Sequence, residues 1–307
     1  MKSRWILCCF ALFSLVGCGK PFAPPAEVVA TTGMIADAVQ QITRGKVQVA
    51  CLMGPGVDPH KFLPSAGDLE SLSSAKLILY NGLHLEGKMV DVLEKPRKGR
   101  KAVAVTARLD EQKDLRKAEV DGGAHDPHVW FDVKLWSKCV ETIRDELCEA
   151  FPQHAEEFRA NAKEYLAELA ALDAEVKKKA ASLPKERRVL VTSHDAFGYF
   201  GAAYGFEVHG LQGVSTAASS ATNDVEELSQ MIRTKKVPAI FTETSVPTQG
   251  LKQVLDTVQS QDNRKVRLIG GDDALYSDAL GDAGSAGASY IGMVRHNIDV
   301  IVKALAE

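Results

Sequence analysis

A stretch of about 31 residues without glycine or proline lies in the middle of the chain, from Gln153 to Leu183. Pro152 suits the first turn of a helix, and Pro184 would end that helix. Apolar residues recur inside the stretch at spacings of three and four, which predicts one apolar face on a helix of about 45 Å. A coiled-coil arm would show the same pattern. Because structured halves flank the stretch, we interpret it as a rigid strut that joins them.

Short apolar runs alternate with helical patterns on both sides of this stretch. Strands are predicted at 28–32, 47–53, 76–80 and 102–105, and then at 188–192, 207–211, 239–242 and 266–269. Helices are predicted at 34–43, 65–73, 85–93 and from 133, and then at 195–204, 223–234, 249–260 and 285–306. Such alternation is typical of parallel sheets covered by helices. The sequence therefore predicts an α/β protein with two parallel-sheet lobes, 28–152 and 184–307, joined by one long helix at 153–183.

The first 27 residues are predicted to lie outside this fold. Lys2 and Arg4 flank the start of an apolar run at 5–16, which is too short to span a bilayer comfortably and is typical of a signal peptide. The run ends in LVGC at 15–18, which resembles the lipobox of bacterial lipoproteins. We therefore expect a signal peptide at 1–17, a lipid on Cys18 and a tether at 18–27. The protein would be anchored in the cell envelope, on the periplasmic or extracellular face. An ordinary signal peptide with a chance cysteine is the alternative.

Charge and cysteine content exclude some kinds of site. The net charge is -3, so there is no electrostatic reason to expect nucleic acid binding. Three cysteines remain once the signal peptide and Cys18 are set aside, and they lack the spacing of a metal site. They cannot all pair with one another, and the sequence leaves their disulfide state open: Cys51, Cys139 and Cys148.

Three histidines each stand beside or near a carboxylate: His60 after Asp58, His128 after Asp126, and His194 before Asp195. A neutral imidazole can bind a metal through one nitrogen while a carboxylate or carbonyl holds the other. A loop whose polar side chains are simply hydrogen-bonded would explain any one of these histidines alone, but the same pattern occurs three times. His60 and His194 follow predicted strands, and His128 fits a strand end, where ligand groups gather in parallel sheets.

A loop rich in glycine and aspartate at 270–284 adds candidate carboxylates. Three histidines and one aspartate would make a plausible four-ligand metal site. The sequence pattern alone does not select among the four aspartates of the loop: Asp272, Asp273, Asp278 and Asp282.

Four segments resemble the signatures of the TroA-type metal-binding lipoproteins of bacterial ABC importers. They are GPGVDPH at 54–60, DPHVWFD at 126–132, SHDAFGY at 193–199 and YSDALG at 276–281. The resemblance covers essentially the whole mature chain, including the long helix. It implies a solute-binding protein, not an enzyme, that carries zinc, manganese or iron as cargo. Its expected partners are an ABC permease with its ATPase, and the membrane through the lipid anchor. We expect the chain to act as a monomer.

The resemblance also implies the ligands. His60 and His128 would come from the N-terminal lobe, and His194 and Asp278 from the C-terminal lobe, with the metal between them. Asp278 is selected only by the match at 277–281. His125 lies outside the matched motif. Glu243 ends a predicted strand and would either support the site or lie at the surface. Further candidates for supporting or helix-capping roles are Asp58, Asp126, Asp132 and Asp195.

The physiological metal stays open. Many zinc-specific relatives carry a long histidine-rich loop, and the charged stretch at 108–124 contains no histidine. Some manganese-dedicated relatives have a glutamate where His194 stands.

One alternative function is a zinc metallohydrolase, although four protein ligands would leave no open position for water and no His-Glu-x-x-His motif is present. A second alternative function is an adhesin lipoprotein in which the metal has only the structural role of holding the two lobes together.

Overall fold

A computed structural model describes residues 26–95, 101–118, 125–218, 220–261 and 265–307. The predicted signal peptide, Cys18 and all but the last two residues of the predicted tether lie outside these ranges. Among the described residues, no helix combines the length and the apolar character needed to cross a bilayer.

The N-terminal lobe is built on a parallel sheet of four strands in the order β2-β1-β3-β4. The strands are β1 (Val28–Thr32), β2 (Val49–Met53), β3 (Leu77–Tyr80) and β4 (Lys101–Ala104). Its helices include α1 (Gly33–Thr43), α2 (Ala66–Ser74) and α3 (Val90–Glu94). All five residues of β1 are buried, which is why a central parallel strand reads as a continuous apolar run. Ser65 caps α2 through a capping box with Asp68.

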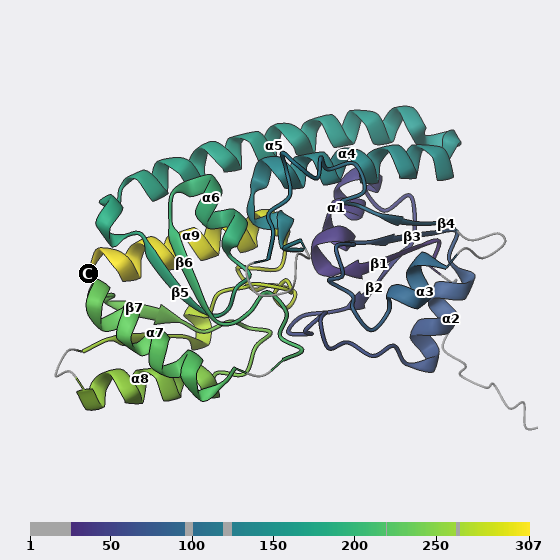
Figure 1. Ribbon diagram of the computed structural model, residues 1–307. Coiled ribbons are helices and arrows are strands. Elements are labelled where there is room, and N and C mark those ends of the chain that lie inside the picture. Colours follow the sequence, from purple (N-terminus) through teal and green to yellow (C-terminus); the bar gives the residue numbers. More distant parts are fainter. Residues whose placement is uncertain (1–25, 96–100, 119–124, 219, 262–264) are drawn as a thin grey trace, which may run out of the picture.

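The C-terminal lobe repeats this arrangement with a second parallel sheet in the order β6-β5-β7-β8. The strands are β5 (Val189–His194), β6 (Glu207–Gln212), β7 (Ala239–Phe241) and β8 (Arg267–Ile269). The helices are α6 (Gly198–Tyr204), α7 (Thr222–Lys235), α8 (Gln249–Gln261) and α9 (Tyr290–Ala306). The predicted fold class, two parallel-sheet α/β lobes, is therefore confirmed (Figure 1).

The long helix α5 (Ala155–Ala181) follows α4 (Val133–Ala150) and runs along both lobes (Figure 1). It is shorter than the predicted 153–183, because Pro152–His154 form a separate 3-10 turn. Its buried face packs against α1 and α4 on one side of the molecule and against α6 and α9 on the other. The helix therefore does more than join the lobes, because its apolar face is part of the hydrophobic core of the molecule.

Three other helices begin at least three residues later than the sequence predicts. The last helix begins at Tyr290 and not at 285, because Ser289 supplies the N-cap by accepting a hydrogen bond from the Gly292 N–H at 3.1 Å. Gly284, at φ 87, lies in the series of turns and bends that precedes this helix. The predicted helix at 195–204 begins only at Gly198, and that at 85–93 is reduced to turns followed by α3.

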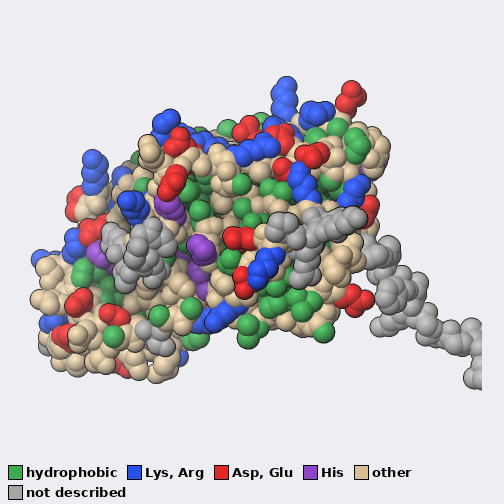
Figure 2. All heavy atoms as spheres, turned by 45° about the vertical axis from the view of Figure 1, so that its right-hand side comes forward, with side chains coloured by type: hydrophobic (Ala, Val, Ile, Leu, Met, Phe, Trp, Pro, Cys, Tyr) green, Lys and Arg blue, Asp and Glu red, His purple; other side chains and the backbone are tan. Residues whose placement is uncertain are grey.

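The three cysteines that lie inside the fold are all free. Cys139 and Cys148 are buried on α4 as packing residues, whereas Cys51 is exposed on β2. On the face shown in Figure 2, Lys and Arg side chains are interspersed with Asp and Glu side chains, so neither charge forms a continuous patch there.

Candidate metal centre

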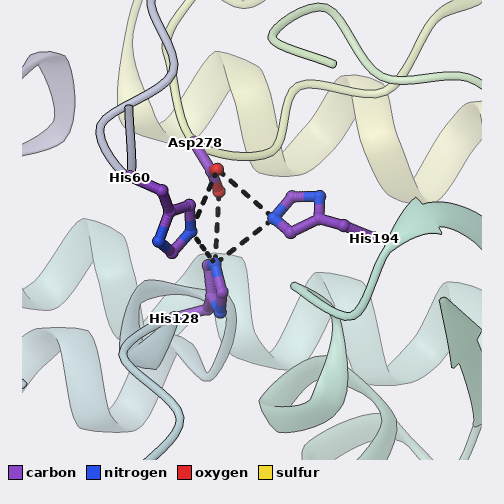
Figure 3. Close-up of side chains that lie close together, drawn as sticks. All are labelled: His60, His128, His194 and Asp278. Carbon is purple, nitrogen blue, oxygen red and sulfur yellow. Dashed lines mark hydrogen bonds and ion pairs between the residues drawn. The ribbon is translucent and has the colours of Figure 1, made fainter. Parts of the chain in front are cut away.

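Four side chains from distant parts of the chain converge where the two lobes meet (Figure 3). One donor atom of each lies within 4.8 Å of the donor atoms of the others. His128 and His194 are fully buried, and the other two residues are at most 4% exposed. These are the four residues predicted as ligands: His60, His128, His194 and Asp278.

Each lobe contributes two of these side chains; one stands at the end of a strand and the other three lie in loops. His194 is the last residue of β5, and His60 lies in the loop after β2. His128 directly precedes the 3-10 turn Val129–Phe131, and its backbone, at φ -83 and ψ 45, lies outside the helical region. Asn81, which follows β3, donates its side-chain N–H to the Pro127 carbonyl at 3.0 Å and so ties the loop of His128 to the sheet. Asp278 lies in the loop between β8 and α9.

The separations of the donor atoms suit a small tetrahedral ion. The Nε2 atom of His128 lies 3.3 Å from Nε2 of His60 and 3.4 Å from Nε2 of His194. The Asp278 carboxylate lies 3.3 Å from His194 Nε2, 3.4 Å from His128 Nε2 and 3.6 Å from His60 Nε2. An ion with bonds of about 2.0–2.1 Å places tetrahedral ligands about 3.3–3.4 Å apart. These five separations therefore lie within about 0.3 Å of those in a tetrahedral zinc site.

The Asp278 carboxylate gives independent evidence for a cation. Both of its oxygens are buried, and neither accepts a hydrogen bond from the described residues. Oδ1 approaches His128, while Oδ2 approaches His60 and His194, so both oxygens face the centre of the cluster. A buried carboxylate is costly unless a positive charge compensates it; the protonated His128 and His194 supply that charge in the metal-free protein, and a bound cation would supply it once they lose their protons. Three imidazoles and this carboxylate thus fit a divalent metal ion.

Two further carboxylates orient the rings of His128 and His194. Asp126 Oδ1 lies 2.8 Å from His128 Nδ1 and accepts the His128 backbone N–H at 2.9 Å. Glu243 Oε2 lies 2.6 Å from His194 Nδ1, and Glu243 Oε1 accepts the His194 backbone N–H at 2.9 Å. In both cases Nδ1 is held by a carboxylate and Nε2 is left to face the cluster, the arrangement found around metal-binding histidines.

The partner of His194 is not the one next to it in the sequence. Asp195 follows His194 directly, but Glu243, two residues after the end of β7, makes the hydrogen bonds. Because β7 lies beside β5 in the sheet, the residues that follow the two strands meet at the same edge. Of the other candidates, Asp58 accepts the His60 backbone N–H at 3.0 Å, and Asp132 caps α4 by accepting the Lys134 N–H at 2.9 Å.

Trp130 links the lobes beside the cluster. Its indole N–H donates to the carbonyl of Ser277 at 3.0 Å, directly before Asp278, and its own carbonyl accepts the Tyr290 hydroxyl at 2.7 Å. The ring of Trp130 also packs edge-on against the ring of His128, with centroids 5.2 Å apart. The backbone position of Asp278 therefore depends on a residue of the same motif that carries His128.

His125 lies outside the cluster. It pairs with Lys117 in an isolated β-bridge, and its Nε2 lies 3.7 Å from a carboxylate oxygen of Glu111. Within the described ranges, the four-residue cluster is the only group of three or more His, Cys, Asp or Glu side chains that could hold an ion.

Burial and neighbouring charges change the pKa values of the four residues in different directions. Burial lowers the pKa of His60 to about 4, against the attraction of Asp278. Burial also lowers the pKa of His128, but the hydrogen bond to Asp126 and the charge of Asp278 together raise it to about 9. The pKa of His194 lies well above its usual value, because the charges of Glu243 and Asp278 outweigh burial. Burial raises the pKa of Asp278, but His194 and His128 hold it well below its usual value.

Metal binding at pH 7 is expected to release about two protons per ion, one from His128 and one from His194, since a metal ligand must be deprotonated. Protons compete below the raised pKa values, so affinity should rise as the pH is raised from 7 to about 9, the pKa of His128. Calorimetric titration in buffers of different ionisation enthalpy measures this release. A binding enthalpy that is the same in every buffer would contradict it.

Comparison with known proteins places the chain in a family. The model of the family described as zinc-uptake complex component A, periplasmic (ZnuA), matches residues 28–304. The chain belongs to the ZnuA family. This membership confirms the resemblance to TroA-type proteins. The ZnuA family is one of uptake components and not of enzymes.

Two ZnuA-family relatives and one solved structure show how far the similarity extends. The chain is 52% identical over 290 residues to the zinc-binding protein TroA of Treponema pallidum, covering 94% of this chain and 90% of TroA. It is 45% identical over 301 residues to the manganese-binding lipoprotein MntA of Bacillus subtilis, covering 96% of each. The structure of the periplasmic zinc binding protein TroA from Treponema pallidum superposes with a TM-score of 0.87 and 50% identity, covering 92% of this chain and 99% of that one.

Proposed function

We propose that this protein captures a divalent transition metal between its lobes and delivers it to the permease of an ABC importer. The proposed ligands are His60, His128, His194 and Asp278. The observation that carries the proposal is the buried Asp278 carboxylate, which accepts no hydrogen bond from the described residues and lies 3.3–3.6 Å from three imidazole nitrogens. The names of the relatives, one zinc-binding and one manganese-binding lipoprotein, support such a cargo.

The geometry argues against the metallohydrolase alternative. A catalytic zinc site keeps one position open for water. Here four protein donors surround the centre, and each of the four residues is at most 4% exposed. A substrate that has to reach an attacking water would find neither space nor an open position. No feature of the described residues favours the adhesin alternative.

The protein is expected to bind both Zn²⁺ and Mn²⁺, and to bind zinc more tightly. Imidazole suits zinc, and manganese stands at the weak end of the divalent series. Both oxygens of Asp278 face the cluster, so a bidentate carboxylate would supply the extra ligand that manganese accepts. The measurement is competition: metal-free protein is loaded with mixed Zn²⁺ and Mn²⁺ without oxygen, and the bound metal is quantified. Failure to bind manganese at all would reduce the cargo to zinc, and a preference for manganese would refute the argument from ligand type.

A Cys18→Ala variant is expected to lose fatty-acid labelling and membrane association. The lipobox-like LVGC at 15–18 makes Cys18 the acceptor of the lipid, and the word lipoprotein in the name of the Bacillus subtilis relative supports an anchor in the cell envelope. Metabolic labelling and membrane fractionation of wild type and variant measure both properties. A variant that still takes up label and still sediments with membranes would contradict the lipid anchor.

Delivery to a permease is tested in the cell. Genes for an ATPase and a membrane permease beside this gene would supply the partners. Deleting the gene should then reduce metal accumulation to the same extent as deleting the permease gene. Unchanged accumulation in metal-limited medium would refute delivery, even if the purified protein binds metal.

A further inference from the structure

The three histidines of the cluster are not held in the same way. His128 and His194 each have Nδ1 fixed by a carboxylate, at 2.8 Å and 2.6 Å. In the part of the chain that the structure describes, no such hydrogen bond reaches Nδ1 of His60. His60 is held through its backbone, since its N–H donates to Oδ1 of Asp58 at 3.0 Å. The position of this ligand therefore depends on the position of its loop.

Among the described residues, one charge-assisted hydrogen bond ties the loop of His60 to the opposite lobe. The Thr216 hydroxyl donates to Oδ2 of Asp58 at 2.6 Å, between residues 158 positions apart in the sequence. Thr216 is 1% exposed and lies shortly after β6, whose last residue pairs with His194 in the sheet. Lys61 also approaches Asp58 Oδ2, at 3.5 Å, but it belongs to the same loop and its side chain is 46% exposed.

Another part of the loop borders a cavity. This cavity of about 540 Å³ is lined by Pro55 and Gly56 of the loop and by Thr244, Tyr276 and Asp282 of the C-terminal lobe. Gly56 has φ 70, a conformation that glycine adopts without strain. The loop thus has room to move on the side of the cavity and is fastened at Asp58.

We propose that Thr216 is a positioning residue for His60: through Asp58, its hydroxyl holds the His60 loop against the C-terminal lobe and sets the rate at which the metal leaves. This inference rests on the proposed function and adds the step at which release begins. Detachment of Asp58 from Thr216 frees the loop, and His60 is then withdrawn from the metal while His128 and His194 stay fixed by their carboxylates.

The test compares Thr216→Val, which removes the hydroxyl at nearly constant shape, with Thr216→Ser, which keeps it. Each protein is loaded with Zn²⁺ and mixed rapidly with an excess of a fluorescent chelator. Zinc release from Thr216→Val should be faster by about tenfold or more, the factor that loss of a hydrogen bond to a charged group produces. The association rate should stay within about twofold of wild type, because most changes in affinity lie in dissociation. Thr216→Ser should release zinc at nearly the wild-type rate.

Two controls separate this role from a general loss of stability. Thr257→Val removes a hydroxyl that bonds only to the Gln253 carbonyl of its own helix α8, and it should leave the release rate unchanged. In an Asp58→Ala background, Thr216→Val should have no further effect, since Thr216 acts only through Asp58. Equal release from wild type and Thr216→Val, or a full effect of Thr216→Val without Asp58, would overturn the inference. Both results presuppose a wild type that binds zinc; a wild type that binds none would refute the proposed function itself.

Discussion

A His128→Ala variant is expected to lose metal affinity by more than about 100-fold. Replacing a residue that only orients a metal ligand already lowers the affinity by about 10–100-fold, and His128 is itself a proposed ligand. His128 is fully buried, and its Nε2 lies 3.3–3.4 Å from donor atoms of the three other proposed ligands. No other histidine of the described chain stands close enough to replace it.

Thermal unfolding gives a second measure of the same loss. At a free zinc concentration of about 100 times the wild-type dissociation constant, binding should stabilise the wild type by about 2.7 kcal/mol. This increment should nearly vanish in His128→Ala. His209→Ala is the matched control, because His209 pairs only with Glu207 on β6, at 2.8 Å, and lies outside the cluster. A variant at position 128 that keeps the zinc-dependent shift would contradict the proposed ligand set.

A Glu243→Gln variant is expected to lose metal affinity by about 10–100-fold, although Glu243 does not face the metal. The carboxylate accepts from both the backbone N–H and Nδ1 of His194. A glutamine has one carbonyl oxygen, so its NH₂ group must face one of these two donors. If it faces Nδ1, the ring proton moves to Nε2, the nitrogen that is needed for the metal. If it faces the backbone, the N–H of His194 loses its acceptor.

The control for this charge removal is Glu207→Gln. It changes a carboxylate that also pairs with a histidine nitrogen at 2.8 Å, but on the exposed face of β6. Competition with a chelator of known affinity measures both variants. Glu207→Gln should match the wild type, and a Glu243→Gln variant that also matched it would refute the orienting role of Glu243.

Both sheets could be predicted from the sequence because their central strands are buried. Central strands of a parallel sheet are covered on both faces, so β1 and β5 each begin with three consecutive apolar residues and lack the helical spacing of their neighbours. Helix ends were harder to predict. Ser285 and Ser289 are both good N-caps, and only the turn around Gly284 decides for Ser289.

The proposed site was predictable in part. The three histidines stand out because each lies beside or near a carboxylate, whereas Asp278 shares its loop with three chemically identical aspartates. Glu243 could not be paired with His194, because that requires knowing that β7 lies beside β5. The contact between Thr216 and Asp58 joins loops of different lobes, and no local pattern in the sequence indicates it.

The packing of α5 has a consequence for how a transporter would tell loaded protein from empty protein. Because α5 is buried against helices of both lobes, a wide change in the angle between the lobes would break the core, so only a small tilt and local loop movements are expected. The metal-free protein would then present nearly the same outer surface to the permease as the loaded protein. It would act as a competitive inhibitor of its own loaded form, and the rate of uptake would follow the ratio of the two forms.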